Sequence, residues 1–291
     1  MSATIIDGEA IAAEIRDEVA TDVRAIVERD GKPPHLTAIL VGDDPASHSY
    51  VRGKARDCKA VGISSETLTL PAETPMDALL ARIAELNANL NISGMIVQLP
   101  LPDHMDDATA TRAVDPAKDV DGLHPENLGL LARGEPRYVS ATPSGVQQML
   151  MRSGHDPAGK RVVVVGRSTL VGRPLAMLLS NKGPGANATV TMAHTGTVDL
   201  PAVTREAEIL IVAAGRPRMV TAEMVAPGAV VIDVGVNRID DASRKRGYRL
   251  VGDVDFDAVS EVASAITPVP HGVGPLTRAM LLVNTVKAAS R

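Results

Sequence analysis

Aromatic residues are scarce in this chain. Its 291 residues include three tyrosines, one phenylalanine and no tryptophan. The hydrophobic core must therefore consist mainly of Val, Ile, Leu, Ala and Met side chains, which are commonly buried in folded proteins. A tyrosine among polar residues, such as Tyr50 in "SHSYVRGK", consequently raises the question of what it binds.

Cysteine and metal-binding motifs are lacking as well. Cys58 is the only cysteine, which excludes an internal disulfide and a cysteine-rich metal site. The seven histidines are scattered along the chain, and neither an H-E-x-x-H motif nor a Walker A turn occurs. We expect Cys58 to be a small buried hydrophobic residue, and we expect no metal in the active site.

Long apolar runs and basic tracts are also missing. No stretch reaches the ~20 apolar residues that span a bilayer, and the N-terminal "MSATIIDGEA" has neither the basic nor the apolar region of a signal peptide. A net charge of -5 without a basic stripe argues against a nucleic-acid partner. We therefore expect a cytoplasmic protein that binds neither membranes nor nucleic acid.

The first half of the chain alternates helical and strand patterns. After a cap at Asp7, apolar residues recur every four positions and predict one buried helix stripe, formed by Ile11, Ile15, Val19, Val23 and Val27. Thr74 and Pro75 predict the cap and first turn of another helix. Strands are expected at 35–42, 66–70 and 94–102, and a further helix at 47–62.

The second half predicts a sheet of a different kind. Residues 111–140, rich in Asp, Gly and Pro, are typical of an active-site loop and domain connection. Short apolar strands then alternate with helical or loop segments, which predicts a parallel sheet covered on both faces; these strands are 161–166, 188–194, 208–215 and 229–236. We expect an α/β protein with domains at 1–140 and 141–274, and a C-terminal helix at 275–291 that packs back on the first domain.

The turn "VVVVGRSTLVGRP" resembles a dinucleotide-binding fingerprint but departs from it. Gly166 ends a strand and Gly172 opens a helix, whereas Ser168 stands where G-x-G-x-x-G has its second glycine. A helix N-terminus after such a turn offers N–H groups and a positive dipole end to a phosphate, and the Ser168 hydroxyl can add a hydrogen bond. A purely structural turn is the alternative explanation of the same residues.

The next strand indicates which dinucleotide is bound. NAD-specific sites place a carboxylate about 20 residues further on, where it binds the ribose 2′-hydroxyl. Here the strand ends in "MAHTGT", without a carboxylate. Arg167 offers a planar cation and Thr195 a hydroxyl, both suited to a 2′-phosphate. The sequence thus favours NADP.

A second group of polar residues lies in the first half. Tyr50 and Lys54 are four apart on an expected helix and share a face, and Gln98 lies near the carboxyl end of an expected strand, where ligands collect in open α/β sheets. Asp119 and Asp121 lie in the polar loop "PAKDVDGLHPENLG". Taken singly, these residues have structural explanations: packing for Tyr50, a solvated charge for Lys54, a strand-end hydrogen bond for Gln98 and a turn for Asp121.

Together these residues offer a more specific chemistry. A tyrosine can stack on a flat heterocycle, and an aspartate can accept two N–H bonds from an amino-pyrimidinone edge. A lysine in a partly desolvated cleft can have its pKa lowered toward neutrality for proton transfer. Gln98 could hold the amine of Lys54 in place.

Seven segments cover nearly the whole chain in a recognisable order. They are "VGDDPASHSYVRGKARDCKAVGI", "GMIVQLPLP", "PAKDVDGLHPENLG", "VVVVGRSTLVGRPLAMLL", "ATVTMAHTGT", "VVIDVGVNR" and "TPVPHGVGPLT". In sequence and order they resemble the bifunctional methylenetetrahydrofolate dehydrogenase/cyclohydrolase family (FolD type).

The resemblance implies a homodimer of a two-domain α/β protein. The N-terminal domain would be the folate-binding catalytic domain and the C-terminal domain a Rossmann-like NADP-binding domain, with a cleft between them. The implied reactions are hydride transfer from 5,10-methylenetetrahydrofolate to NADP⁺ and hydrolysis of the resulting 5,10-methenyltetrahydrofolate to 10-formyltetrahydrofolate. Tetrahydrofolate derivatives are thus the implied substrates.

The same resemblance assigns roles to individual residues. Lys54 transfers the proton, Gln98 orients Lys54, Tyr50 stacks on the substrate and Asp121 anchors its pterin-like ring. The other implied substrate-binding residues are Val97, Leu99, Pro268, Val269, Pro270 and Gly272. The implied cofactor-binding residues are Gly166, Arg167, Ser168, Gly172, Thr195 and Val236.

Two positions depart from the family pattern. His271 stands where the family commonly has the first glycine of P-V-P-G-G-V-G-P, so either substrate affinity and pH dependence change or the side chain points to solvent. Ala141 replaces the cysteine of P-C-T-P, a substitution that predicts a change in packing only.

Two alternatives to this function remain at the level of sequence. An NADP-dependent shikimate-type dehydrogenase would explain the architecture but not "VQLPLP" or "KDVDG". A nucleotide-binding protein without catalysis would bind NADP without turnover, but Tyr50, Lys54, Gln98 and Asp121 are all present.

Overall fold

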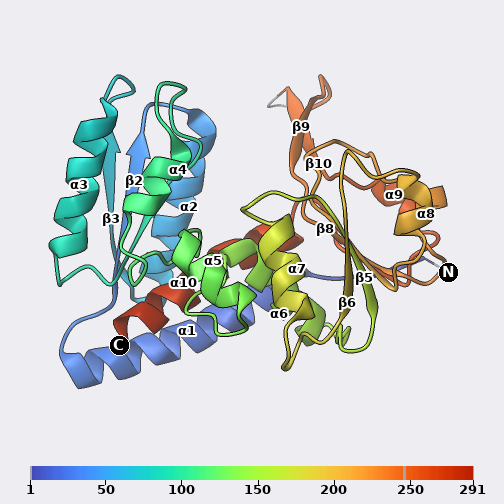
Figure 1. Ribbon diagram of the computed structural model, residues 1–291, viewed down its shortest axis with the longest axis horizontal. Coiled ribbons are helices and arrows are strands. Elements are labelled where there is room, and N and C mark those ends of the chain that lie inside the picture. Colours follow the sequence, from blue (N-terminus) through green and yellow to red (C-terminus); the bar gives the residue numbers. More distant parts are fainter. Residues whose placement is uncertain (1, 245–246, 291) are drawn as a thin grey trace. The chain divides into compact units, whose positions relative to one another are not determined.

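The computed structural model describes residues 2–244 and 247–290, and it divides into two compact units (Figure 1). The three-stranded unit comprises Ala13–Ala141 and Arg278–Arg291, and the six-stranded unit comprises Met1–Ala12 and Thr142–Thr277. Helices α1 (Gly8–Asp30) and α10 (Val273–Ala289) each contribute residues to both units.

The three-stranded unit has a parallel sheet in the order β3-β2-β4. Its strands are β2 (His35–Val41), β3 (Ser64–Leu70) and β4 (Gly94–Val97), and its further helices are α2 (Pro45–Val61), α3 (Met76–Ala88), α4 (Asp107–Ala113) and α5 (Pro125–Ala132). One hydrophobic cluster joins β2 and β4 to α3 and α4. Helix α2 ends as expected at Gly62, which adopts the left-handed conformation at φ +83°.

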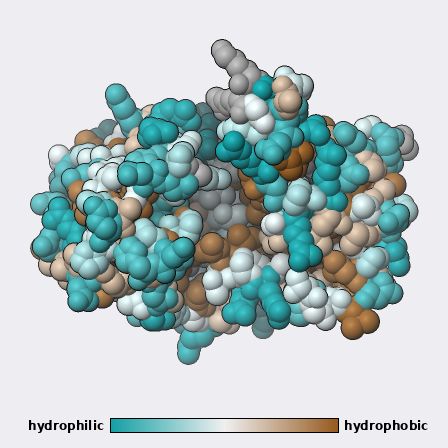
Figure 2. Space-filling view, turned by 90° about the horizontal axis from the view of Figure 1, so that it is seen from above, coloured by the Kyte–Doolittle hydropathy of each residue, from teal (hydrophilic) through white to brown (hydrophobic). Residues whose placement is uncertain are grey.

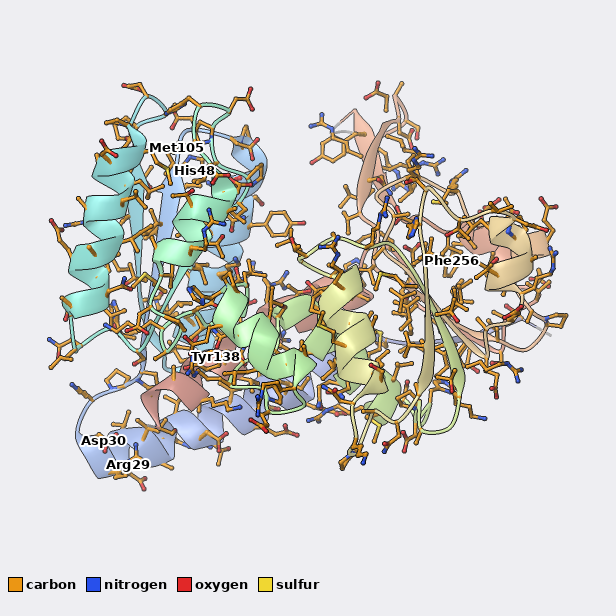
Figure 3. All side chains as sticks on the ribbon, in the orientation of Figure 1. Arg29, Asp30, His48, Met105, Tyr138 and Phe256 are labelled. Atoms are coloured by element: carbon orange, nitrogen blue, oxygen red, sulfur yellow. The ribbon has the colours of Figure 1, made fainter. Side chains whose placement is uncertain are left out.

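The six-stranded unit has the expected parallel sheet, in the order β1-β11-β8-β7-β5-β6. Its strands are β1 (Thr4–Ile5), β5 (Arg161–Val165), β6 (Thr189–Ala193), β7 (Ile209–Val212), β8 (Val230–Asp233) and β11 (Ala265–Ile266). The helical elements are α6 (Ala141–Arg152), α7 (Gly172–Ser180), α8 (Leu200–Thr204), η1 (Ala222–Met224) and α9 (Phe256–Val259). Strands β5, β7 and β8 are almost wholly buried, and Phe256, labelled in Figure 3, packs against their cluster.

The N-terminal boundary differs from the expected one. Residues 1–12 were expected in the first domain, but β1 pairs in parallel with β11, and this segment is grouped with the six-stranded unit. The pairing was missed because two strands of two residues each carry no readable alternation. An antiparallel hairpin of β9 (Asn237–Asp240) and β10 (Tyr248–Val251) was also not predicted.

The prediction of the buried stripe of α1 is confirmed at the start of the helix and wrong at its end. The side chain of Asp7 accepts hydrogen bonds from Glu9 N and Ala10 N, so it caps the helix as expected. Ile26 is buried at 5% exposure, whereas Val27 is 38% exposed. Because the helix has 3.6 residues per turn, a strict spacing of four drifts by about 40° per step and leaves the buried face.

The start of α3 differs from the expected one. Thr74 does not cap α3, because its hydroxyl donates to the carbonyl of Pro71 at 2.7 Å and Pro75 occupies the cap position.

Over the described ranges, none of the helices combines the length and apolarity that crossing a bilayer requires. Figure 2 shows one face of the molecule, where hydrophilic residues are interspersed with apolar ones.

Candidate active site

Lys54 and Gln98 meet within the three-stranded unit. Lys54 lies on α2, and Gln98 follows directly after β4, where its backbone N–H donates to the carbonyl of Ile39 at 2.9 Å. The Lys54 Nζ donates to Gln98 Oε1 at 3.2 Å, and Gln98 Nε2 donates to the carbonyl of Leu99 at 2.8 Å. The second bond fixes the amide so that its oxygen faces the lysine, which orients one N–H of the Lys54 amino group.

Helix α2 presents Tyr50 one turn before Lys54. The Tyr50 residue is 51% exposed, which is high for an aromatic residue. On the next turn the buried Asp57 accepts a hydrogen bond of 2.5 Å from Arg278 Nε of α10, which fixes this end of α2. The helix therefore holds Lys54 between an anchored turn and an exposed aromatic side chain.

The loop that carries Asp121 is fixed by its neighbours. Asp119 is 4% exposed and accepts hydrogen bonds from His124 N and Asn127 Nδ2. Burial raises the pKa of the Asp119 carboxyl. Lys118 Nζ donates to three carbonyls at the end of α3, those of Leu86, Asn87 and Asn89.

Hydrogen bonds from Met95, Asn284 and Tyr138 also tie the same loop to the unit. Met95 N of β4 donates to the carbonyl of Lys118 at 2.8 Å. The Asn284 amide of α10 donates to the carbonyls of Val120 and Val139, at 2.8 and 2.9 Å. Tyr138, labelled in Figure 3, is buried and donates to the carbonyl of Ala117. Asp121 is half-buried, and hydrogen bonds hold the loop residues before and after it in the chain.

Val97 and Leu99 were expected to flank the substrate. The Val97 side chain is 7% exposed and belongs to the hydrophobic cluster of β2, β4, α3 and α4, and Leu99 packs against that cluster. Their side chains therefore contribute to the core. Leu99 is half-buried, so part of this residue remains accessible.

The turn after β5 opens a cavity of about 470 Å³ in the six-stranded unit. Four of the predicted cofactor-binding residues, Gly166, Arg167, Ser168 and Thr195, line it. Gly166 has φ +132°, and a Cβ at this position would lie 2.3 Å from the carbonyl oxygen of Ala213. Only glycine allows the turn to approach the end of β7 this closely.

Ser168 and Gly172 shape the start of α7. Ser168 Oγ accepts hydrogen bonds from Val171 N at 3.1 Å and Gly172 N at 3.5 Å, so its own O–H can still donate to a ligand. A Cβ on Gly172 would lie 2.2 Å from the carbonyl oxygen of Gly166. Gly172 therefore permits the turn and the helix to pack, although it does not itself line the cavity as described.

Sequence reasoning missed three polar residues of this cavity, namely His194, Thr197 and Arg216. Thr197 Oγ1 accepts from His194 N at 2.8 Å, and His194 Nδ1 accepts from Gly196 N at 3.0 Å. The stretch "AHTGT" contained the signal for the first two. Among the described residues that line the cavity, two are arginines and none is acidic.

The remaining expected residues lie elsewhere in the six-stranded unit. Pro268, Val269 and Pro270 line a different cavity of about 570 Å³, together with residues of β10 and with Asp233. Val236 is 49% exposed just after β8. Gly272 is buried, and a Cβ there would lie 2.5 Å from the carbonyl oxygen of Pro268.

The two departures from the family pattern have structural outcomes. His271 adopts φ +82°, the left-handed region that favours glycine. Its side chain is 67% exposed, and Nδ1 lies 3.4 Å from Glu9 Oε1. Ala141 is 3% exposed at the start of α6, as a packing substitution requires.

Asp233 is a buried carboxyl at the end of β8. It is 3% exposed, and burial raises its pKa to about 7, with the nearby Asp253 charge adding to the shift. Three backbone N–H groups, those of Gly235, Asp253 and Val254, donate to it and counteract the shift in part. Desolvation thus outweighs three hydrogen bonds.

This pKa predicts how stability depends on pH. Since the folded pKa lies above the unfolded value of 3.8, the folded chain keeps a proton that the unfolded chain releases. Raising the pH from 4 to 7 should therefore reduce the free energy of unfolding, by roughly 4 kcal/mol at most from this group. We expect the melting temperature of wild type to fall over that window and the curve of Asp233→Asn to be flatter. Parallel curves would contradict the assignment.

Comparisons with known proteins place the chain among folate enzymes. The model of the tetrahydrofolate dehydrogenase/cyclohydrolase catalytic domain matches residues 6–121, and that of the NAD(P)-binding domain of the same family matches residues 140–291. The chain is 56% identical over 287 residues to the bifunctional protein FolD of Salinibacter ruber, covering 99% of this chain and 96% of that protein.

Solved structures agree with this similarity. The methylenetetrahydrofolate dehydrogenase-cyclohydrolase (FolD) of Trypanosoma brucei, complexed with NADP cofactor and inhibitor, matches with a TM-score of 0.94 and 40% identity, covering 100% of this chain and 98% of that chain. Shikimate 5-dehydrogenase of Thermus thermophilus matches with a TM-score of 0.53 and 17% identity, covering 88% and 98%. The second likeness shows a shared fold only.

Among the described residues, no three His, Cys, Asp or Glu side chains form a cluster that could hold a metal ion.

Proposed function

The chain belongs to the tetrahydrofolate dehydrogenase/cyclohydrolase family, and we propose that it oxidises 5,10-methylenetetrahydrofolate with NADP⁺ and hydrolyses the 5,10-methenyl product to 10-formyltetrahydrofolate. The observation that carries the proposal is the 3.2 Å hydrogen bond from Lys54 Nζ to Gln98 Oε1 at the carboxyl edge of the three-stranded sheet. It brings a proton-transfer group and a group that orients it together from two elements 44 positions apart.

The hydrolytic reaction needs proton movement, and we assign it to Lys54. A water oxygen bonds to the methenyl carbon and loses one proton, which leaves a hydroxyl group on that carbon. The bond from the carbon to one ring nitrogen then breaks as the nitrogen gains a proton and the hydroxyl loses its own, so the formyl C=O forms and one proton is released in all. The Lys54 amine is the group that takes up and returns the proton. Gln98 positions this amine, Tyr50 stacks on the flat ring system, and the Asp121 carboxylate accepts N–H bonds from its amino-pyrimidinone edge.

The oxidation relies on positioning. A C–H bond of the methylene carbon breaks, and its hydrogen leaves with both electrons. The resulting methenyl cation is stabilised by the lone pairs of the two adjacent nitrogens, so no strong general base is required. NADP⁺, when bound, supplies the hydride acceptor.

The residues of the 470 Å³ cavity suit NADP. Arg167 and Thr195 would bind the 2′-phosphate, because a guanidinium and a hydroxyl pair with phosphate oxygens. The free O–H of Ser168 and the N-terminus of α7 would bind the diphosphate. We assign Val236 to a backbone contact at the nicotinamide end, and the segment Pro268–Gly272 to the folate substrate.

Removing the Arg167 guanidinium tests the cofactor assignment. We expect Arg167→Ala to raise KM for NADP by a factor corresponding to roughly 1 to 3 kcal/mol, because charge-assisted bonds to the 2′-phosphate are lost. KM for NAD should change little, since NAD lacks that phosphate. Steady-state kinetics with both cofactors measures the difference, and equal increases would refute the assignment.

The proposal extends to assembly and location. We propose a cytoplasmic homodimer that acts on small folate substrates without nucleic acid or membrane partners, in keeping with the family. Light scattering of the purified protein tests the proposed assembly, because a homodimer gives twice the monomer mass.

A further inference from the structure

Asp253 is a fully buried carboxylate that joins two loops of the six-stranded unit. It is 0% exposed and follows β10 by two residues. Its Oδ2 accepts hydrogen bonds from Ala214 N at 2.7 Å and Gly215 N at 2.8 Å, after β7. Its Oδ1 accepts from Asn237 Nδ2 at 2.8 Å, at the start of β9. One side chain thus holds the segments that follow β7 and β8.

Both segments lie at the edge of the sheet where the cofactor cavity opens. Ala213 and Ala214 line that cavity. Ligands of open parallel sheets bind outside the carboxyl ends of the strands, which is where these loops begin. A carboxylate behind the cavity wall therefore sets the position of the wall itself.

The second segment is held on both sides of Val236. Gly235 N donates to Asp233 at 3.0 Å, and the Asn237 side chain donates to Asp253. A Cβ on Gly235 would lie 2.2 Å from Cγ of Asp253, so the loop packs directly on the carboxylate. Val236 remains 49% exposed between these two anchors.

Burying a charge without a cationic partner is costly, and here the compensation is three neutral donors. A purely structural link between these loops could be made without a charge. What the carboxylate adds is two acceptor atoms that can take three donors from two loops at once.

We propose that Asp253 is a positioning residue for the cofactor: it fixes the loop of Ala213–Gly215 and the loop of Val236 in the single arrangement that binds the dinucleotide. The proposal rests on the function proposed above. Asp253 acts through these loops and touches neither substrate nor cofactor.

The test compares graded variants by calorimetric binding of NADP⁺. Asp253→Ala removes all three bonds and is expected to weaken NADP⁺ binding by tenfold or more. Asp253→Asn is expected to lose only two- to threefold, because its oxygen can face Ala214 and Gly215 while the Asn237 amide turns over to accept from its NH₂ group. Asn237→Ala removes one bond only, and about a fivefold loss is expected.

Controls separate positioning from folding. Asp255→Ala changes the same residue type two positions away, where the side chain makes no capping bond, and should bind NADP⁺ like wild type. At saturating methenyltetrahydrofolate, kcat of hydrolysis should stay near wild type in all variants, because the proton-transfer group Lys54 and its partner Gln98 belong to the other unit. At saturating folate, KM for NADP should rise more than kcat falls.

Wild-type affinity in Asp253→Ala would overturn the proposal. If Asp253→Ala does not fold, wild-type affinity in Asn237→Ala overturns it instead. A wild-type protein that binds NADP⁺ but oxidises no methylenetetrahydrofolate would refute the proposed function, while the binding series would still decide the role of Asp253.

Discussion

Replacing Lys54 with methionine is expected to lower the hydrolysis of methenyltetrahydrofolate by about 10²- to 10⁴-fold, the range typical of removing a general acid-base group. Methionine keeps a long apolar stem and loses the amino group. The hydrogen bond to Gln98 disappears, and no amine remains to take up the proton of the attacking water. Folate binding should persist, because the variant leaves Tyr50 and Asp121 in place.

Hydrolysis is followed by the loss of methenyl absorbance, and folate binding by calorimetry. Lys59→Met is a matched control, because Lys59 lies on the exposed side of the last turn of α2. It should hydrolyse like wild type. Full hydrolysis by Lys54→Met would remove the lysine from the mechanism.

Adding one methyl group at Gly172 is the second substitution with a large expected effect. In Gly172→Ala the methyl would lie 2.2 Å from the Gly166 carbonyl oxygen and 2.9 Å from Arg167 N, both of them backbone atoms. The start of α7 must therefore move away from the turn. We expect a loss of about 1 to 3 kcal/mol in stability, as for other overpacked sites, and at least a tenfold rise in KM for NADP.

Thermal unfolding and NADP kinetics measure these effects together. Gly129→Ala is the control, since no atom lies within 4 Å of a Cβ there and alanine favours the helix α5. Its melting temperature should be unchanged or higher. If Gly172→Ala bound NADP like wild type, close packing at the turn would not be what the cofactor site needs.

The central strands of the sheets could be predicted because they are apolar on both faces. Residues 161–165 and 209–212 are buried along nearly their whole length, and a run of Val, Ile and Leu marks such strands in the sequence. Strands β9 and β10 form a half-exposed ribbon with charged residues, and β1 and β11 have two residues each. Their pairing depends on tertiary contacts that no local pattern records.

Some residues of the candidate site could likewise be predicted from the sequence, and others could not. Gln98 could be placed at the site from sequence, because ligands collect at the carboxyl ends of parallel strands. Lys54 could be added because it shares a helix face with Tyr50 and its amine complements the Gln98 amide. Ser168 and Gly172 could be read from the turn motif. Asp253 could not, because the donors it holds come from two other segments of the chain.

Arg216 illustrates a further limit. It lines the same cavity as Arg167, although the two residues lie 49 positions apart on different loops. Neighbouring strands β5 and β7 bring their carboxyl ends together, and only the strand order reveals this. The sequence predicts an anion site at the turn, but it could not predict the second arginine of the cavity.

The most direct measurement supplies methylenetetrahydrofolate with either NADP⁺ or NAD⁺ and follows the reduced cofactor and the methenyl absorbance together. The account predicts NADPH formation with a transient methenyl signal that decays to 10-formyltetrahydrofolate, and a slower reaction with NAD⁺. It would be contradicted by a protein that reduces neither cofactor with this substrate, or that reduces NADP⁺ with shikimate instead.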